Sequence, residues 1–212
     1  KITWDTKAAV LEKIMKYERV HEIKDMDELK RRLGEDRRFF SYFHPALEDE
    51  PIIFVQVALT NGLGKSIQEI TKPRSEGDKK YDSATFYSIS NCQEGLSRVT
   101  LGNFLIKRVV FEIQEELPNI KKFGTLSPIP GFRDWFSYLE DSKIKNILGN
   151  IPIENISFLR SPDLKPGDPR IVSNKDALLK LVSHYLMNEK NHKQLPINDV
   201  CRFHLGNGAI ID

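Results

Sequence analysis

The sequence has little cysteine, no long apolar run and almost no net charge, and each shortage excludes a class of protein. Two cysteines among 212 residues, Cys92 and Cys201, are too few for a disulfide framework or a cysteine-based metal site. They suit a reducing compartment, although a single bridge between them stays open. No apolar stretch approaches the ~20 residues that cross a membrane. A formal net charge of +2, from 32 basic and 30 acidic residues, gives no general reason to expect nucleic acid or a membrane surface as partner.

The common ligand motifs are missing as well. The chain contains neither G-x-G-x-x-G nor G-x-x-x-x-G-K-[ST], so it carries no standard nucleotide fingerprint. Ser127 lies in the sequence GTLSP rather than in a G-x-S-x-G elbow, which disfavours a hydrolase of that class. The five histidines are scattered without H-x-x-x-H spacing and without a carboxylate cluster. The sequence therefore predicts no metal site.

The composition, 40% hydrophobic and 29% charged, fits one well-buried globular domain or one domain with a small appendage. Helical and strand patterns alternate with long inserts, which predicts an α/β fold with a mixed sheet. The chain starts without methionine and stops inside an apolar run, so we expect a piece of a longer polypeptide. Helices are predicted at residues 6–18, 25–33, 103–117, 132–139 and 174–189, and strands at 38–44, 52–59, 84–91, 123–127, 156–160 and 200–205.

The chain is organised around residues 84–117, which predict a strand, a glycine-bearing loop and a helix. The strand alternates, with Phe86, Ser88 and Ser90 on one face and the residues between them on the other. Asn103 is the predicted cap of the helix. Amide groups left unpaired at a helix N-terminus attract anions, most often phosphate, and Gly102 permits close approach to the backbone. Many such units bind nothing, so the pattern alone leaves both interpretations open.

Three further features have an ordinary and a functional interpretation. The basic residues between 30 and 38 are typical of a solvated face, or else they contact a ligand's phosphates. Ser127 ends a predicted strand before a proline, at the edge where α/β folds place ligand-contacting groups. His204 lies in a strand-like apolar run, where a lone histidine is more often a hydrogen-bonded core residue than a catalyst.

Taken together, several stretches resemble the malonyl-CoA decarboxylase family. The specific ones are TLSPIPGF (125–132) and FHLGNGA (203–209), supported by FYSISNCQEGLSRVTLGNFLIKRVV (86–110). Weaker similarity is found at 26–38, 55–60 and 185–190, so the resemblance covers most of the chain in the same order. It implies a GNAT-like mixed β-sheet flanked by helices, as a single catalytic domain over 1–212. In that interpretation residues 1–20 end a preceding helical domain or linker, and the C-terminus is truncated.

The resemblance also implies roles for individual residues. Ser127 and His204 correspond to the catalytic pair, with His204 as proton donor and Ser127 as proton acceptor that touches the malonyl carboxylate; the sequence does not decide which of them delivers the proton. Ser88 corresponds to a position near the acyl group. Thr100 stands where some relatives carry an acidic residue. The loop that grips the pyrophosphate of coenzyme A corresponds to Ser97, Arg98, Val99, Thr100, Leu101, Gly102 and Asn103.

The implied reaction converts malonyl-CoA to acetyl-CoA and carbon dioxide in fatty-acid metabolism, without a metal or organic cofactor. The partners implied are malonyl-CoA and further copies of the chain, as a homo-oligomer such as a tetramer, but no nucleic acid or membrane. The mitochondrial matrix, the peroxisome and the cytoplasm are all compatible compartments. Two alternatives stay open: a CoA-dependent acyltransferase of the GNAT type that uses the same loop, and a non-catalytic CoA-binding module.

Overall fold

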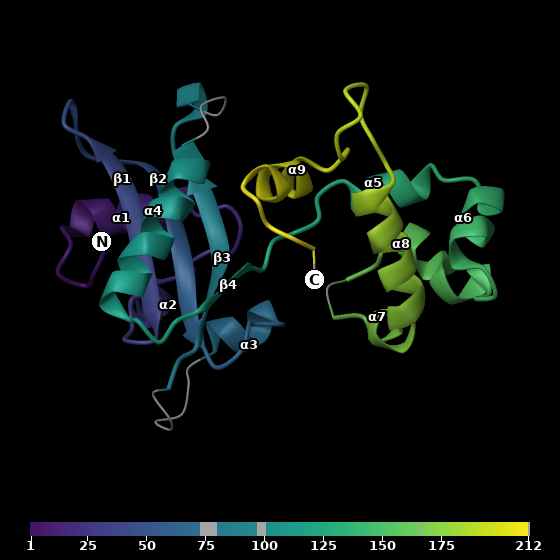
Figure 1. Ribbon diagram of the computed structural model, residues 1–212, viewed down its shortest axis with the longest axis horizontal. Coiled ribbons are helices and arrows are strands. Elements are labelled where there is room, and N and C mark those ends of the chain that lie inside the picture. The colour runs from purple at the N-terminus through teal and green to yellow at the C-terminus, as the bar shows by residue number, and fades with distance from the viewer. Residues whose placement is uncertain (73–79, 97–100, 166, 212) are drawn as a thin grey trace. The chain divides into compact units, whose positions relative to one another are not determined.

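The computed structural model describes residues 1–72, 80–96, 101–165 and 167–211 (Figure 1). The chain forms two compact units, Lys1–Ser127 and Pro128–Asp212, which are called unit 1 and unit 2 and are described separately. Unit 1 contains the sheet, and the described part of unit 2 is made of helices.

Unit 1 is a four-stranded mixed sheet with helices on both faces, as the sequence predicts. The strands lie in the order β1-β2-β3-β4, in which the first three are antiparallel and β4 is parallel to β3. The strands are β1 (Arg37–His44), β2 (Leu47–Thr60), β3 (Ser83–Asn91) and β4 (Lys122–Thr125). The helices are α1 (Ala8–Tyr17), α2 (Met26–Arg32), α3 (Ile67–Thr71), the short 3₁₀ helix η1 (Glu94–Leu96) and α4 (Leu101–Glu116).

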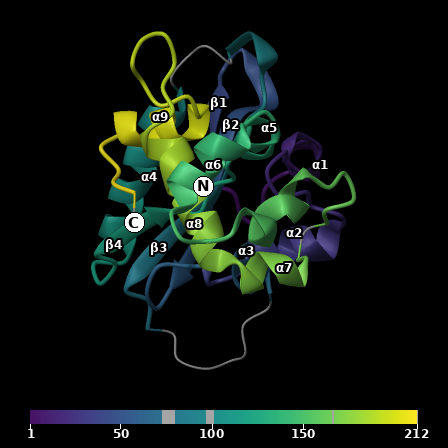
Figure 2. The ribbon, with the colours of Figure 1, turned by 90° about the vertical axis from the view of Figure 1, so that its right-hand side faces the viewer.

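Two apolar cores lie on opposite faces of this sheet. On one face, α4 places Leu105, Val109 and Ile113 on the strands, at the helical spacing that the sequence predicts. On the other face, α1 and α2 pack on Phe39 and Phe54, whose rings lie 5.2 Å apart. Figure 2 shows α4 on one side of the strands and α1 and α2 on the other. The middle of β2 is buried on both faces, which explains why its sequence is almost entirely apolar.

A β-bulge at Tyr87 changes the predicted alternation of β3. Neighbouring residues of β2 pair with Ser88 and Phe86, so Tyr87 between them has no partner across the ladder. Phe86 and Ile89 consequently pack on the α4 core, whereas Ser88 and Ser90 face the opposite side. The predicted grouping of Phe86 with the two serines is wrong, because one inserted residue shifts every later side chain to the other face.

The four arginines near α2 are built into unit 1, whereas Lys30 is exposed: Arg31, Arg32, Arg37 and Arg38 bond to carbonyl or carboxylate oxygens of this unit. Arg31 and Arg37 both pair with Asp36, at 2.8 and 2.9 Å. Arg38 pairs with Glu116 at the end of α4, at 2.6 Å. These contacts tie the start of β1 to both neighbouring helices, and such arginines have their donors engaged within the protein.

The start of β2 and the type of two later segments differ from the prediction. Pro45 and Ala46 form the turn after β1, and β2 starts at Leu47, ahead of the strand predicted at 52–59. Residues 156–160 lie in a 3₁₀ helix and residues 200–205 in an α-helix, although both runs are strand-like in composition. In the first run Ile156 and Leu159 are buried three residues apart, the 3₁₀ period. Short apolar runs do not separate helix from strand.

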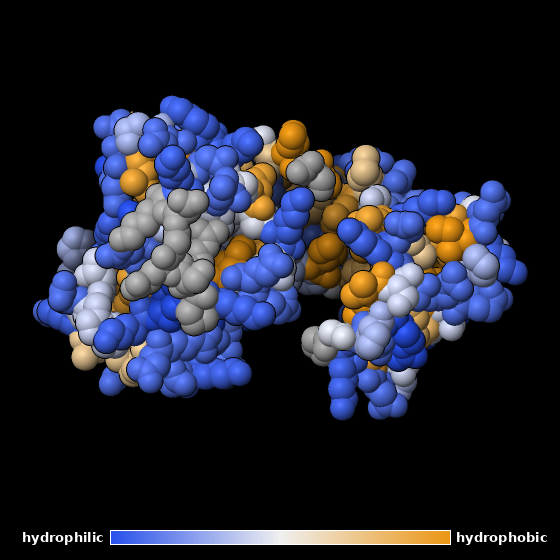
Figure 3. All heavy atoms as spheres, turned by 90° about the horizontal axis from the view of Figure 1, so that it is seen from below, coloured by the Kyte–Doolittle hydropathy of each residue, from blue (hydrophilic) through white to orange (hydrophobic). Residues whose placement is uncertain are grey.

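Unit 2 is helical in its described part. Its elements are α5 (Phe132–Ser137), α6 (Asp141–Leu148), the 3₁₀ helix η2 (Ile153–Arg160), α7 (Pro169–Ser173), α8 (Lys175–Met187) and α9 (Asp199–Gly206). The core is formed by Phe136, Ile144, Leu148, Ile156 and Leu181, which pack between α5, α6, η2 and α8. Apolar side chains interrupt the hydrophilic surface of this unit in Figure 3. Tyr138 and Val172 of this unit are 88% and 78% exposed.

Two findings bear on the compartment and the membrane. Cys92 and Cys201 are both free and buried, and burial raises the pKa of Cys92 to about 12. Within the described ranges, no helix combines the length and the apolar character that a membrane crossing requires.

The packing of α4 predicts a large difference between two of its residues. Ile113 is 0% exposed, so Ile113→Ala should lower the free energy of unfolding by about 2–5 kcal/mol. Phe111 on the same helix is 51% exposed, and Phe111→Ala should cost under about 1 kcal/mol. Urea unfolding of both variants checks this, and equal losses would contradict the assignment of the buried face.

Candidate active site

The predicted phosphate-binding loop lies partly outside the described residues. Ser97, Arg98, Val99 and Thr100 fall in the gap between 96 and 101, whereas Leu101, Gly102 and Asn103 form the first turn of α4. Asn103 therefore lies inside the helix, and the prediction that it caps the helix is wrong. Gly102 is buried and Leu101 packs against the α4 core. The N-terminus of a 16-residue helix lies in this turn, and its amide groups give that end a partial positive charge.

Ser88 projects from β3 onto a buried carboxylate. Its side chain is 2% exposed, and its Oγ donates a hydrogen bond of 2.6 Å to Oε2 of Glu18. Ser88 lies on that face because of the bulge at Tyr87, whose hydroxyl donates to Gln56 Oε1 at 3.0 Å. The carboxylate of Glu18 accepts hydrogen bonds from two backbone N–H groups and three side chains: Val20, His21, Gln56, Ser88 and Ser90.

Sequence analysis gave no role to Glu18, which is 6% exposed just past the end of α1. A buried carboxylate is tolerated when several donors replace its water, and five do so here. His21 lies beside this cluster, and burial lowers the pKa of its imidazole. The sequence did carry a signal for such a partner. Gln56, Ser88 and Ser90 are polar residues inside apolar strands, and a buried polar group needs a hydrogen-bond partner.

Ser127 is the last residue of unit 1 and lies two residues beyond β4. The preceding residue, Leu126, donates its N–H to the carbonyl of Phe86 at 2.8 Å, which extends the contact with β3. Pro128 and Pro130 follow, and the strand ends before them, as predicted. Ser127 is therefore half-buried at the end of a parallel strand, next to the strand that carries Ser88.

His204 lies on α9 in unit 2 rather than on a strand. Its side chain is half-buried, and its ring meets Phe203 edge-on with centroids 5.0 Å apart. Burial lowers the pKa of the imidazole below its usual value. Its backbone carbonyl accepts N–H groups from Asn207 and Ala209 at the end of the helix. A neutral ring near pH 7 that readily exchanges a proton is suited to acid–base chemistry.

The structure thus groups the predicted residues by unit. Ser88, the first turn of α4 and Ser127 belong to unit 1, and His204 belongs to unit 2. Among the residues that the structure describes, no group of three histidine, cysteine or acidic side chains is arranged to hold a metal ion.

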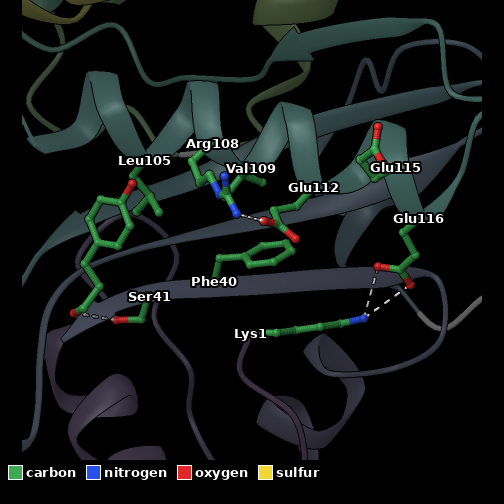
Figure 4. A pocket seen from close by; sticks show the side chains of 10 residues that line it. Lys1, Phe40, Ser41, Leu105, Arg108, Val109, Glu112, Glu115 and Glu116 are labelled. Carbon is green, nitrogen blue, oxygen red and sulfur yellow. Dashed lines mark hydrogen bonds and ion pairs between the residues drawn. The ribbon is translucent and has the colours of Figure 1, made fainter.

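A cavity of about 540 Å³ lies in unit 1 between β1 and the side of α4 (Figure 4). Its wall includes Arg108, which pairs with Glu112, and Lys1, which pairs with Glu116. None of the described predicted site residues lines it. Three carboxylates against two cations make it a poor place for a diphosphate, so the cavity does not compete with the helix terminus as an anion site.

The fold first defines a class. The GNAT-like loading domain of CurA from Lyngbya majuscula is a structural neighbour with a TM-score of 0.55 and 14% identity, over 95% of this chain and 80% of that one. The mixed sheet of this chain, with α4 after its third strand, therefore has a GNAT-like fold, as the resemblance implies.

Sequence and structure comparisons then define the family. The model of the malonyl-CoA decarboxylase C-terminal domain matches residues 1–212. The mitochondrial malonyl-CoA decarboxylase of Anser anser anser is 37% identical over 99% of this chain, and that of Mus musculus is 36% identical over 100%. The malonyl-CoA decarboxylase structure from Agrobacterium vitis has a TM-score of 0.82 at 42% identity, over 98% of this chain. The chain belongs to the malonyl-CoA decarboxylase family, which confirms the predicted resemblance.

The chain spans about half the length of these relatives. It covers 46% of the Anser sequence, 47% of the Mus sequence and 52% of the Agrobacterium chain.

The Glu18 cluster predicts that Ser88 contributes to stability whatever else it does. Ser88→Ala removes one of five donors from a buried carboxylate, which should lower the free energy of unfolding by about 1–3 kcal/mol. Ser183→Ala, at an exposed position on α8, is the matched control and should change it little. A Ser88→Ala variant as stable as the unchanged protein would exclude this hydrogen bond.

The burial of His204 predicts its titration. The NMR midpoint of its ring protons in the folded protein should lie below about 6.5, and in urea it should return to about that value. Since the folded pKa is the lower one, protonation of His204 costs stability as the pH falls below about 6.5. A folded midpoint at or above the value in urea would contradict the buried placement.

Proposed function

We propose that the protein catalyses the decarboxylation of malonyl-CoA to acetyl-CoA and carbon dioxide. The observation that carries the proposal is the family match over the whole of residues 1–212, which includes the segments around Ser127 and His204. Half-burial of both residues and the helix terminus in the first turn of α4 support it.

The coenzyme A end of the substrate would bind at the N-terminus of α4. The pyrophosphate is doubly charged, and an N-terminal turn offers it unpaired amides and a favourable dipole. In this proposal residues 97–103 hold that group, with Leu101, Gly102 and Asn103 as the described part. Gly102 has no side chain that could cover the amide groups of this turn.

The chemistry takes place at the acyl end. The bond between the carboxylate carbon and the α-carbon breaks, carbon dioxide leaves, and the electron pair forms an enolate on the thioester. The site must stabilise the charge on the thioester oxygen, for which backbone N–H donors are suited. A proton then adds to the α-carbon and gives acetyl-CoA. Because no electron leaves the substrate and the thioester itself stabilises the enolate, the proposal needs no metal or organic cofactor.

We assign His204 as the group that delivers the proton to the α-carbon and Ser127 as the hydroxyl that forms a hydrogen bond with the malonyl carboxylate. Histidine is suited to this role because its ordinary pKa lies closer to neutrality than that of any other side chain. Ser88 is proposed to lie near the acyl group, where the Glu18 carboxylate fixes its hydroxyl. The same proposal assigns the enzyme to the carboxy-lyases and includes a homo-oligomer.

The compartment is part of the proposal. The Anser, Mus and Rattus norvegicus relatives are named as mitochondrial enzymes. We propose an intracellular site of action with the mitochondrion as the first compartment to test, and the peroxisome and cytoplasm as alternatives. Localisation of the tagged full-length protein by microscopy distinguishes the three.

Substitution of the two assigned residues tests the activity. In the full-length protein, Ser127→Ala and His204→Ala should each lower kcat for malonyl-CoA by about 10²- to 10⁴-fold, the usual contribution of a proton-transferring group. Carbon dioxide release and acetyl-CoA formation are measured together, with Ser183→Ala as the control at an exposed position.

Unchanged rates in both variants would end the assignment of the pair. Acyl transfer to an amine without release of carbon dioxide would instead indicate an acyltransferase. Protection of the fold from heat by CoA, with no turnover of any acyl-CoA, would indicate a binding module.

A further inference from the structure

The carbonyl of Pro130, three residues after Ser127, is held by two buried side chains. Asn198 donates to it through Nδ2 at 2.7 Å, and Tyr185 donates through its hydroxyl at 3.0 Å. Asn198 is 3% exposed and Tyr185 4% exposed. Two donors on one loop carbonyl, both out of water, fix the position of that peptide group strongly.

The loop around Pro130 has little freedom of its own. Pro128 and Pro130 each fix the backbone angle φ, so the segment after Ser127 has few accessible shapes. Gly131 then turns the chain into α5 with φ of +76°, in the left-handed region. A Cβ atom at Gly131 would lie 2.8 Å from the Tyr185 hydroxyl, which explains why the motif has glycine there.

The other end of the Asn198 side chain holds the helix that carries His204. Its Oδ1 accepts the backbone N–H of Cys201 at 2.8 Å, and Asn198 is thereby the N-cap of α9. Cys201 is buried, and its Sγ lies 3.8 Å from the carbonyl of Leu186 on α8. His204 follows one turn after the residue that is held in this way.

We infer that Asn198 is a positioning residue, because one buried amide ties the loop that follows Ser127 to the helix that carries His204. The inference rests on the proposed function, in which these two residues act on one acyl group. Asn198 touches neither substrate nor reacting atom in this account. It acts by keeping the Pro130 end of the serine segment and the start of α9 in one fixed arrangement.

An asparagine that serves only as a helix cap is the alternative explanation. Serine and aspartate cap helices about as well as asparagine, so a cap can be kept while the donor to Pro130 is removed. Asn198→Ser is too short to reach the carbonyl. Asn198→Asp keeps the shape of the side chain, but it places a carboxylate oxygen against the carbonyl oxygen.

The kinetic test uses these variants in the full-length protein with malonyl-CoA as substrate. Asn198→Ser and Asn198→Asp should lower kcat by roughly 10- to 100-fold, because small misplacements of reacting groups have effects of this size. KM should change less than about threefold, since Asn198 bonds to Pro130 and Cys201, whereas the helix terminus proposed to bind CoA belongs to α4. Tyr185→Phe removes the second donor to the same carbonyl and should lower kcat in the same way.

Asp168→Ala is the matched control. Asp168 caps α7 in the same unit by accepting the N–H of Arg170 at 2.9 Å, so the variant also loses a helix cap. Its kcat should stay within about twofold of the unchanged protein, since capping losses elsewhere affect stability rather than catalysis.

Amide hydrogen exchange supplies a readout that needs no turnover. In Asn198→Ser, exchange should accelerate at residues 131–135 and at 199–204 together, because the tie holds both segments. Unchanged exchange at 131–135 in this variant would show that Asn198 is only a cap, and this result would overturn the inference.

The outcomes separate the inference from the proposed function. If the protein without substitutions releases carbon dioxide from malonyl-CoA, and Asn198→Ser and Tyr185→Phe have the same kcat as that protein, the inference is overturned while the proposed function stands. An unchanged protein that does not decarboxylate malonyl-CoA would reject the proposed function, and with it a catalytic purpose for the tie. Reduced kcat with KM retained and paired exchange changes would support both.

Discussion

The burial of one face of α4 against the sheet is the contact on which the rest of unit 1 depends. Leu105, Val109 and Ile113 are at most 2% exposed, and they lie against residues from β1, β2 and β3. This packing fixes where the helix begins, and so it fixes where its first amide groups lie. The anion site that we propose there is made of main chain and has no side chains of its own to hold it in place. It relies on the apolar stripe that lies a few residues further along.

On the opposite face of the sheet, a bulge in β3 and a buried carboxylate depend on each other. The bulge at Tyr87 turns Ser88 and Ser90 toward Glu18, so that three strand side chains and two amides surround one carboxylate. Without the bulge these polar groups would lie on the α4 face, among apolar side chains. The bulge and the buried carboxylate therefore belong together: each would be unfavourable alone, and together they give the Ser88 hydroxyl a single orientation.

Local features of the sequence predicted local features of the structure well. Strand β3 and helix α4 were predictable as elements because alternation in a strand and an apolar stripe in a helix are periodic over enough residues, but the bulge at Tyr87, which changes the face of the later side chains, was not. The cap of α2 by Asp25 was predictable because its partner, the N–H of Glu28, is three residues away. The segments around Ser127 and His204 were recognised by family resemblance, which carries information that periodicity does not.

The features that were missed or wrong depend on distant contacts or on very short segments. Glu18 meets Ser88 across 70 positions of sequence, and Asn198 meets Pro130 across 68. The helix that carries His204 has eight residues, and its apolar run suits a strand equally well until Asn198 caps it. No local pattern records such long-range pairings, because either partner alone is an ordinary polar residue. Their discovery required the folded chain.

The central claim is that a histidine and a serine complete a decarboxylation on a CoA thioester held at a helix terminus. The most direct measurement is the product formed from malonyl-CoA by the full-length protein in heavy water, read by mass spectrometry. The account predicts carbon dioxide and acetyl-CoA with one deuterium on its methyl group, because an enolate takes one proton from the site. Malonyl-CoA that is returned unchanged, or a malonyl group passed intact to an acceptor, would contradict it.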